Sequence, residues 1–112
     1  MMPIRTATPD DRAATVALWA ECGLTRPWND PGLDFDRAVS GPTSAVLLAF
    51  GDDGSIAGSV MVGADGHRGW IYYLGVSVDD RGTGLGRILM QAVYDALEYE
   101  SSDVVVRQKW LS

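Results

Sequence analysis

Glycines cluster in one stretch of this chain, and their spacing points most directly to chemistry. Of the 13 glycines in 112 residues, eight fall between Gly58 and Gly86, and the stretch ends in the run Arg81-Gly82-Thr83-Gly84-Leu85-Gly86-Arg87. A glycine-rich turn between a strand and a helix exposes several backbone N–H groups in one direction, and the helix dipole adds to their attraction for phosphate oxygens. The run therefore predicts a phosphate-binding loop. The alternative is a flexible turn that only lets strand and helix pack closely.

Two other glycine motifs do not fit this run. A dinucleotide-binding fingerprint needs a third glycine where Arg87 stands. A Walker A loop needs Gly-Lys-Ser/Thr, and the only lysine of the chain is Lys109.

The elements that must position the loop are a strand before it and a helix after it. We expect a strand over Trp70–Val78, in which Gly75 indicates a bulge or the close approach of another backbone. The helix after the loop has a continuous apolar stripe. The stripe comprises Leu85, Ile88, Leu89, Ala92, Val93, Ala96 and Leu97.

The remaining elements follow from capping and turn residues. Thr8-Pro9-Asp10-Asp11 predicts a helix start, and Gly23 predicts its end. A loop with two prolines then precedes a short helix over Leu33–Val39. Strands are expected over Ala45–Phe50 and Ser55–Val62, joined by a hairpin turn, and a final strand over Asp103–Leu111.

Composition excludes several classes of protein. The chain has 9 basic and 15 acidic residues, a formal charge of −6, and only one cysteine, Cys22, and one histidine, His67. We therefore expect no nucleic-acid partner, no disulfide framework and no metal site. No apolar run approaches the roughly 20 residues of a membrane helix, and the first residues lack a signal-peptide layout, so we expect a cytoplasmic protein. The length predicts a single domain over residues 1–112.

The run from Leu74 to Gly86 resembles the acyl-CoA-binding motif of the GNAT-type N-acetyltransferases, in which a bulged strand precedes Arg/Gln-x-x-Gly-x-Gly/Ala and an amphipathic helix. Arg81, Gly84 and Gly86 stand at its defining positions. The expected order of elements resembles the family over residues 2–98. The runs 26–31 (RPWNDP) and 65–69 (DGHRG) are similar to those of a subgroup of small bacterial members.

The resemblance implies a fold, a cosubstrate and a reaction. The fold would be α/β, with a mixed, mostly antiparallel sheet flanked by helices. The reaction would transfer an acetyl group from acetyl-CoA to a primary amine by direct attack, without a covalent protein intermediate. The implied acetyl-CoA-binding residues are Leu74, Gly75, Val76, Arg81, Gly82, Thr83, Gly84, Leu85, Gly86 and Arg87.

The residue that takes the proton of the amine is harder to assign. Many members of the family place a glutamate on the bulged strand, where this chain has Tyr72 and Tyr73. Because side chains alternate along a strand, we expect one of the two to face the cleft. His67 and Asp65 are further candidates, and Trp28 is a candidate for the acceptor site. Each candidate has a structural alternative. The tyrosines could serve ordinary strand packing, His67 could be a solvated turn residue, and Trp28 could only anchor its loop.

The resemblance also implies that a segment is missing. The family continues after the third helix with a strand, a helix and a final hairpin, and about 30 of these residues have no counterpart here. We hypothesise an internal deletion near Leu97–Glu98, which removes one strand and one helix, and places Tyr99 at the start of the closing strand. A catalytically impaired CoA-binding remnant or a strand-edge dimerising domain is therefore the alternative function, and a homodimer, with or without domain swapping, is expected.

Overall fold

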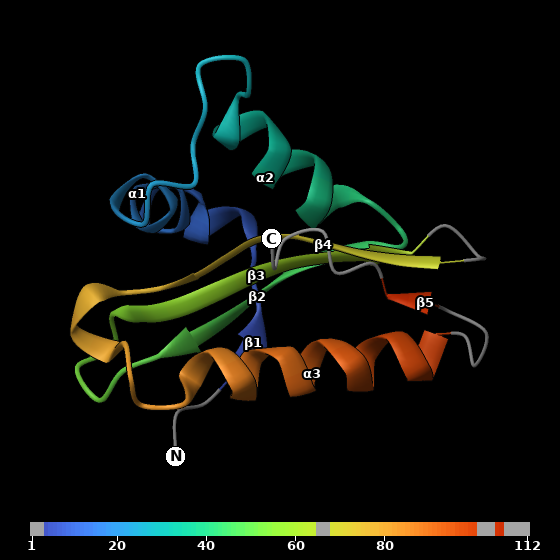
Figure 1. Cartoon of the computed structure of the whole chain (residues 1–112). Helices are drawn as coiled ribbons and strands as arrows, with labels where there is room; N and C mark the ends of the chain where they lie inside the picture. Colours follow the sequence, from blue (N-terminus) through green and yellow to red (C-terminus); the bar gives the residue numbers. More distant parts are fainter. Residues whose placement is uncertain (1–3, 65–67, 101–104, 107–112) are drawn as a thin grey trace.

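The structure is a computed structural model that describes residues 4–64, 68–100 and 105–106. In this part of the chain, a five-stranded sheet has the order β1-β2-β3-β4-β5 (Figure 1). The first four strands are antiparallel, and β5 runs parallel to β4. Their bounds are Ile4–Thr6 (β1), Ser44–Phe50 (β2), Ile56–Ala64 (β3), Arg68–Val76 (β4) and Val105–Val106 (β5).

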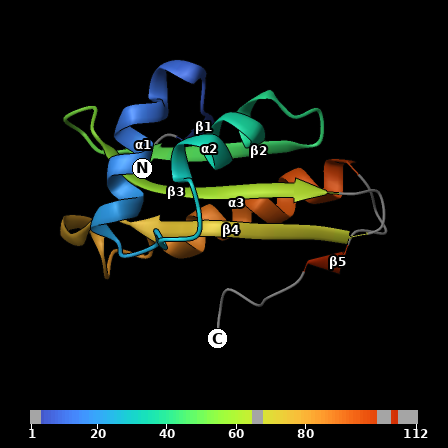
Figure 2. The ribbon, with the colours of Figure 1, turned by 90° about the horizontal axis from the view of Figure 1, so that it is seen from above.

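Helices cover both faces of the sheet. α1 (Arg12–Glu21) and α2 (Pro31–Ser40) lie on one face and α3 (Leu85–Glu100) on the other, as Figure 2 shows from above. The predicted fold class, a mostly antiparallel mixed sheet flanked by helices, is confirmed. No helix in the described ranges is both long and apolar enough to cross a membrane.

α3 packs on the sheet through a narrower stripe than the sequence predicts. Leu85, Leu89 and Val93, one turn apart, are buried against β3 and β4. Ile88 remains 45% exposed, so its expected place in the core is wrong. The reason is geometric. The sheet covers only the side of α3 that carries residues four positions apart, and Ile88 lies at the margin of that side.

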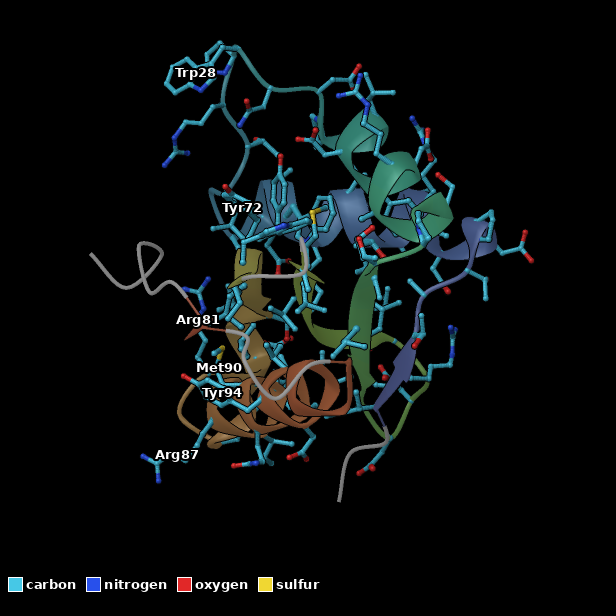
Figure 3. The ribbon with its side chains drawn as sticks, turned by 90° about the vertical axis from the view of Figure 1, so that its right-hand side faces the viewer. Trp28, Tyr72, Arg81, Arg87, Met90 and Tyr94 are labelled. Atoms are coloured by element: carbon cyan, nitrogen blue, oxygen red, sulfur yellow. The ribbon has the colours of Figure 1, made fainter. Side chains whose placement is uncertain are left out.

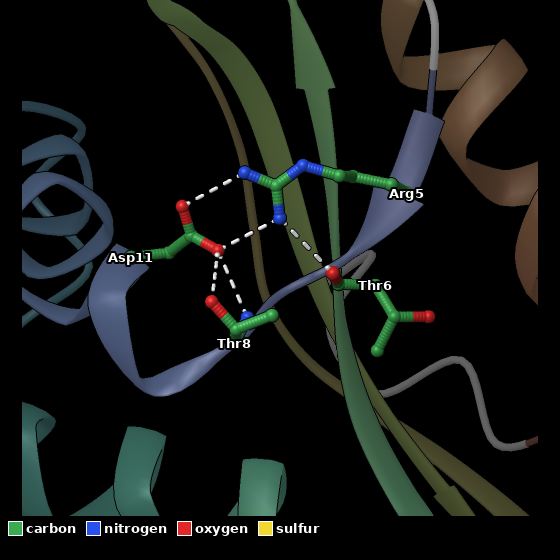
Figure 4. A network of polar contacts seen from close by, with 4 residues as sticks. All are labelled: Arg5, Thr6, Thr8 and Asp11. Carbon is green, nitrogen blue, oxygen red and sulfur yellow. Dashed lines mark hydrogen bonds and ion pairs between the residues drawn. The ribbon is translucent and has the colours of Figure 1, made fainter.

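The start of α1 is held by an ion pair rather than by the threonine hydroxyl. The Arg5 guanidinium donates to both carboxylate oxygens of Asp11, at 2.8 and 3.0 Å, and the Thr8 N–H donates to Asp11 Oδ2 at 2.8 Å (Figure 4). The hydrogen bonds from Arg5 lower the pKa of Asp11 to about 2. A short 3₁₀ turn, Pro9–Asp11, forms here, and α1 begins at Arg12.

The other predicted boundaries agree in part. Gly23, with a φ of +71°, ends α1 as predicted. α2 begins at Pro31 and not at Leu33, since the Asp30 carboxylate accepts from the Leu33 N–H at 3.0 Å, and β4 ends at Val76 and not at Val78. The turn over 65–69 falls partly outside the described residues, whereas Arg68 and Gly69 belong to β4. Tyr99 lies in α3, not at the start of the closing strand.

Candidate active site

β4 contains a bulge at Tyr73. Its φ of +55° is the only positive value at a non-glycine residue in the part of the chain that the structure describes. On β3, Val60 faces two residues of β4, Tyr73 and Leu74. The sequence predicts the irregularity at Gly75, and that position is wrong, because Gly75 pairs regularly with Ser59.

Gly75 serves a different purpose. A Cβ atom at this position would lie 3.0 Å from Leu24 Cδ1 and 3.2 Å from Cys22 Sγ. The close approach that the sequence indicates is made here by side chains that follow α1, and the Gly75 carbonyl oxygen also lies 3.2 Å from where a Cβ would stand on Gly58 of β3. Glycine lets this part of β4 lie directly against them.

The bulge changes the direction of one tyrosine. In a regular strand Tyr72 and Tyr73 would point to opposite faces, so the sequence predicts that one faces the cleft. Both instead line the same cavity on the α1/α2 face. The extra residue of a bulge turns the strand locally, so two successive side chains can share a face.

Tyr73 is fixed by its surroundings. Its ring stacks on Trp19 with centroids 4.1 Å apart, and its hydroxyl donates to Asp34 Oδ2 at 2.7 Å (partners on α1 and α2). Burial, followed by the hydrogen bond to the Asp34 carboxylate, raises the pKa of Tyr73 well above its ordinary value. A phenol held in this way stays protonated at neutral pH.

A buried hydroxyl supports the bulge from β3. Ser59 Oγ accepts from the Trp19 indole N–H at 2.7 Å and donates to the Tyr73 carbonyl oxygen at 3.5 Å. Ser59 and Trp19 are both fully buried. The serine thus satisfies two polar groups where the regular ladder is interrupted.

Tyr72 is much more open than Tyr73. It is 58% exposed, and its ring lies 5.4 Å from that of Trp70, centroid to centroid. Trp70 in turn lies flat over Gly63, where a Cβ atom would come within 2.0 Å of the indole. The two rings form an aromatic wall, and Tyr72 lies at the side of the molecule seen in Figure 3.

The cavity beside this wall has a volume of about 450 Å³ and lies between the α1–α2 segment and β4. Its size falls in the range of small-molecule sites. Most of its lining is apolar, with three polar or charged residues from the loop and from α2. The lining residues are Leu24, Asn29, Asp34, Arg37, Ala38, Met61, Trp70, Tyr72 and Tyr73.

Three predicted site residues are not brought to this cavity by the described structure. Trp28 is 77% exposed at the tip of its loop, away from Tyr72 (Figure 3), and is not among the lining residues. Asp65 and His67 lie outside the described residues. Within the described ranges, no group of three or more His, Cys, Asp or Glu side chains could hold a metal ion.

The glycine loop has the backbone geometry of an anion site. Gly82 and Gly84 have φ values of +84° and +85°, and nothing lies within 4 Å of where a Cβ would stand on either. α3 begins at once, with the Ile88 N–H donating to the Gly84 carbonyl at 3.1 Å. The first N–H groups of a helix have no partner within the helix, so those of the loop and first turn are available to a ligand.

The side chains around the loop divide into structural and free ones. Arg81 Nε donates to the Val76 carbonyl at 3.1 Å, and Thr83 Oγ1 donates to the Asp80 carbonyl at 2.6 Å, so both stabilise the loop. Leu85 is buried in the core, which leaves only its backbone for a ligand. Arg87 is exposed and points away from the body of the molecule (Figure 3).

The outer edge of β4 is only partly covered. β5 pairs with Arg68 and Gly69 alone, and from Trp70 to Val76 no described strand lies on this edge. Tyr72 and Arg81 lie on this side of the molecule (Figure 3). In the described part of the chain, this stretch of the edge leads from the aromatic cavity to the glycine loop.

A bulged strand that runs from an aromatic cavity into a glycine loop and a helix defines the N-acetyltransferase class of enzyme. Comparison with known proteins agrees, since the model of the acetyltransferase (GNAT) family matches residues 8–104. An acetyltransferase of Pectobacterium atrosepticum is 37% identical over 98% of this chain and 96% of its own. The chain belongs to the GNAT acetyltransferase family.

Solved structures show the same fold at low identity. The BH1408 protein of Bacillus halodurans superimposes with a TM-score of 0.78 at 22% identity, over 94% of this chain and 81% of its own. A predicted acetyltransferase of Clostridium acetobutylicum, solved with acetyl-CoA, gives a TM-score of 0.72 at 16% identity, over 96% and 80%. At these identities the likeness concerns the fold.

The Pectobacterium relative is longer than this chain. Its alignment runs over 136 positions, whereas 98% of 112 residues is about 110, so about 26 positions have no counterpart here. Since both chains are covered almost completely, these positions lie inside the alignment.

Sequence reasoning missed the charged pair Asp34 and Arg37 of α2. Phe35 and Ala38 are the buried residues of the same turns, so the pair stands directly beside the buried stripe of the helix. The i, i+3 spacing next to apolar positions is a signal for two side chains at the rim of a covered face. The sequence contains no comparable sign that Ser59 supports the bulge, because a serine within an apolar strand can have many roles.

Proposed function

We propose that this acetyltransferase moves an acetyl group from acetyl-CoA to a primary amine by direct attack of the amine nitrogen on the thioester carbonyl. The observation that carries the proposal is the loop at Gly82 and Gly84, where two positive φ values and the absence of neighbouring atoms leave backbone N–H groups accessible. The residues thus fit a bound pyrophosphate. The Clostridium acetyltransferase solved with acetyl-CoA has the same fold, which supports this cosubstrate.

The reaction needs little from the protein besides binding and proton transfer. The amine nitrogen forms a bond to the acyl carbon, the carbon–sulfur bond breaks, and the sulfur leaves as a thiol once it has taken up a proton. A base takes the proton that the amine gives up. A backbone N–H of β4 is suited to polarise the carbonyl oxygen.

The predicted cosubstrate residues fall into three groups. The N–H groups from Gly82 to Arg87 bind the pyrophosphate, and Arg87 adds a free positive charge nearby. Arg81 and Thr83 hold the loop in shape. The outer edge of β4 around Leu74–Val76 pairs with the pantetheine arm, although the Val76 carbonyl already accepts from Arg81 Nε and, at 3.4 Å, from Cys22 Sγ.

Of the proposed catalytic tyrosines, Tyr72 is better placed than Tyr73 to exchange protons with a substrate. Tyr72 is open to solvent and to the cavity, whereas the Tyr73 hydroxyl is committed to Asp34 and its pKa is raised. We propose that Tyr73 positions Asp34 and shapes the cavity. His67 and Asp65 remain proposed contributors, acting directly or through water.

A second candidate function is a remnant that binds CoA without completing the reaction. About 26 positions of the Pectobacterium relative are absent, and β5 pairs with β4 over two residues only. We propose an internal deletion near Leu97–Glu98, two residues of α3. The edge of β4 from Trp70 to Val76, on which no described strand lies, would favour pairing with a second copy, which makes a homodimer part of this alternative.

Calorimetric titration with acetyl-CoA and with CoA tests the binding site. Gly84→Glu places a charged side chain where phosphate must approach, and we expect it to abolish binding. Gly54→Glu is the matched control, because Gly54 has a φ of +83° and the same open surroundings, but lies in the β2–β3 turn and not in the glycine loop. Both variants carry the same backbone strain, so equal binding by the two would overturn the loop assignment.

Two further measurements separate the alternatives. Thiol release from acetyl-CoA with a panel of primary amines distinguishes an enzyme from a protein that only binds. Intact-mass measurement tests the deletion, for which 12.0 kDa is expected. A mass well above this value would show that the segment is present.

A further inference from the structure

Two residues of opposite charge on one turn of α2, Asp34 and Arg37, line the aromatic cavity without forming an ion pair with each other in the described structure. Asp34 and Arg37 are three residues apart and both line the cavity. Charges at this spacing on a helix commonly form an ion pair. Here Asp34 Oδ2 instead accepts from the Tyr73 hydroxyl at 2.7 Å, and no ion pair joins the two charged residues in the described structure.

Arg37 stands out among the arginines whose side chains the structure describes. Four others donate to protein acceptors: Arg5, Arg12, Arg26 and Arg81. Arg37 and Arg87 make no such bond to the described residues, and Arg87 lies at the proposed phosphate loop. A chain with 15 carboxylates offers many partners. An arginine left unpaired on a cavity wall is therefore suited to an anionic group of a ligand.

The rest of the cavity favours an apolar body. Met61, Leu24 and Ala38 supply aliphatic surface, and the rings of Trp70 and Tyr72 form one wall. Aromatic faces also attract an ammonium group, and the Asp34 carboxylate adds a negative group to the same lining. The lining thus offers separate places for an anion, a cation and an apolar side chain.

We propose that the acceptor amine is a free α-amino acid with a large apolar or aromatic side chain. This inference rests on the proposed function and names the substrate class of the same site. Arg37 binds the carboxylate, Asp34 and the ring faces hold the amino group near β4, and the aliphatic surface receives the side chain. A cavity of about 450 Å³ accommodates a ligand of this size.

The carboxylate separates this substrate from other amines. A simple amine lacks the group that would use Arg37, and a peptide N-terminus carries a neutral amide in its place. The net charge of −6 repels anions from the molecule as a whole. Preferential binding of an amino acid over its amide therefore requires a specific cation, and Arg37 is the cation in the lining of this cavity.

Binding of matched ligands tests the proposal without relying on turnover. L-Phenylalanine, phenylalaninamide, phenethylamine and 3-phenylpropionate differ only in the groups that Arg37 and Asp34 would recognise. Titration followed by tryptophan fluorescence, in the absence and presence of saturating CoA, measures each dissociation constant. We expect phenylalanine to bind roughly tenfold or more tightly than its amide or amine, the loss that one charge-assisted contact brings.

Two variants of equal charge change locate the effect. Arg37→Gln should raise the dissociation constant for phenylalanine about tenfold or more and leave that for phenethylamine unchanged. Arg12→Gln is the control, because Arg12 pairs with Asp36 at 3.0 Å on the outside of the same helices. Equal binding of amino acid, amide and amine by the wild type would overturn the proposal. So would an Arg37→Gln substitution that leaves the dissociation constant for phenylalanine unchanged, or that weakens phenylalanine and phenethylamine equally. Absence of phenylalanine binding under either condition would also overturn it.

The two proposals fail in different ways. If the wild-type chain does not bind acetyl-CoA, the proposed function is contradicted. Amino-acid binding in the absence of CoA is measured independently of that result. Acetyl-CoA binding with transfer only to amines that lack a carboxylate would leave the function standing and overturn the substrate class.

Discussion

The hydroxyl of Ser59 donates to the carbonyl oxygen of Tyr73 at 3.5 Å, so a buried side chain of β3 contacts the bulge of β4. The same hydroxyl accepts from the Trp19 indole N–H at 2.7 Å. The conformation of β4 beside the cavity therefore depends on a residue that touches neither the cavity nor the glycine loop.

Ser59→Ala should lower the free energy of unfolding by about 1–3 kcal/mol, because the buried Trp19 N–H loses its acceptor. Urea unfolding followed by circular dichroism measures the loss. Ser40→Ala is the control, since the Ser40 hydroxyl bonds to the Asp36 carbonyl on the exposed side of α2 and its loss costs a few tenths of a kcal/mol. Equal effects of the two substitutions would contradict the role assigned to Ser59.

Tyr73→Phe should change the alkaline stability of the protein. The pKa of Tyr73 is raised above its ordinary value of 10.0, so the unfolded chain releases this proton before the folded one does. The stabilisation is complete below about pH 10 and falls as the pH rises further, because the unfolded state then binds fewer protons. Unfolding free energies at pH 8 to 11 should decrease less steeply for Tyr73→Phe than for the wild type. Tyr72→Phe removes the hydroxyl of the exposed neighbour and is the control, and equal slopes for the two variants would contradict the role assigned to Tyr73.

Asp11→Asn should change the acid stability in the opposite sense. The pKa of Asp11 is lowered to about 2 from 3.8, so its stabilisation is present above about pH 4 and is lost as the pH falls toward 2. At neutral pH the substitution should cost about 0.5–1 kcal/mol, because the Arg5 partner is largely solvated. Thermal unfolding from pH 2 to 7 measures both effects. Asp10→Asn, with the same charge change in the same turn but at a carboxylate that does not bind Arg5, is the control, and equal effects of the two substitutions would contradict the role assigned to Asp11.

Gly63→Ala should disturb the aromatic wall. Its new Cβ would lie 2.0 Å from the Trp70 ring, so the indole must move, and we expect a loss of about 1–3 kcal/mol in the free energy of unfolding. Near-ultraviolet circular dichroism should change as well. Gly86→Ala meets only Val76 Cγ2 at 4.0 Å and should leave stability unchanged or raise it. A Gly63→Ala variant as stable as Gly86→Ala would contradict the position of Trp70.

Sequence predicted the order of elements and the glycine loop because both depend on local signals. Gly23 and Asp30 determine a helix end and a helix start within a few residues of themselves. The bulge was predicted at Gly75, two residues from its position at Tyr73. A glycine is the usual sign of a positive φ, whereas here a tyrosine adopts it. What holds Tyr73 there comes from Trp19, Asp34 and Ser59, which lie on three other elements.

The cavity shows the same limit. Arg37 and Trp70 are 33 positions apart and line one cavity, because α2 packs over the sheet. Figure 2 shows this position of α2. Opposite charges at i, i+3 are ordinary on a solvated helix, and the sequence contains no sign that these two fail to pair. That information lies in the hydrogen bond from Tyr73 to Asp34, which no local pattern encodes.

The short pairing of β5 with β4 has a consequence for reaction kinetics. From Trp70 onward no described strand lies on the outer edge of β4, so among the described strands β4 alone would contact an acyl-pantetheine arm bound there. An arm held by one strand would have a short residence time, and hydrolysis of the thioester would then compete with transfer to the amine. A shortened acetyltransferase of this kind would turn over only when the amine arrives before the acyl donor leaves.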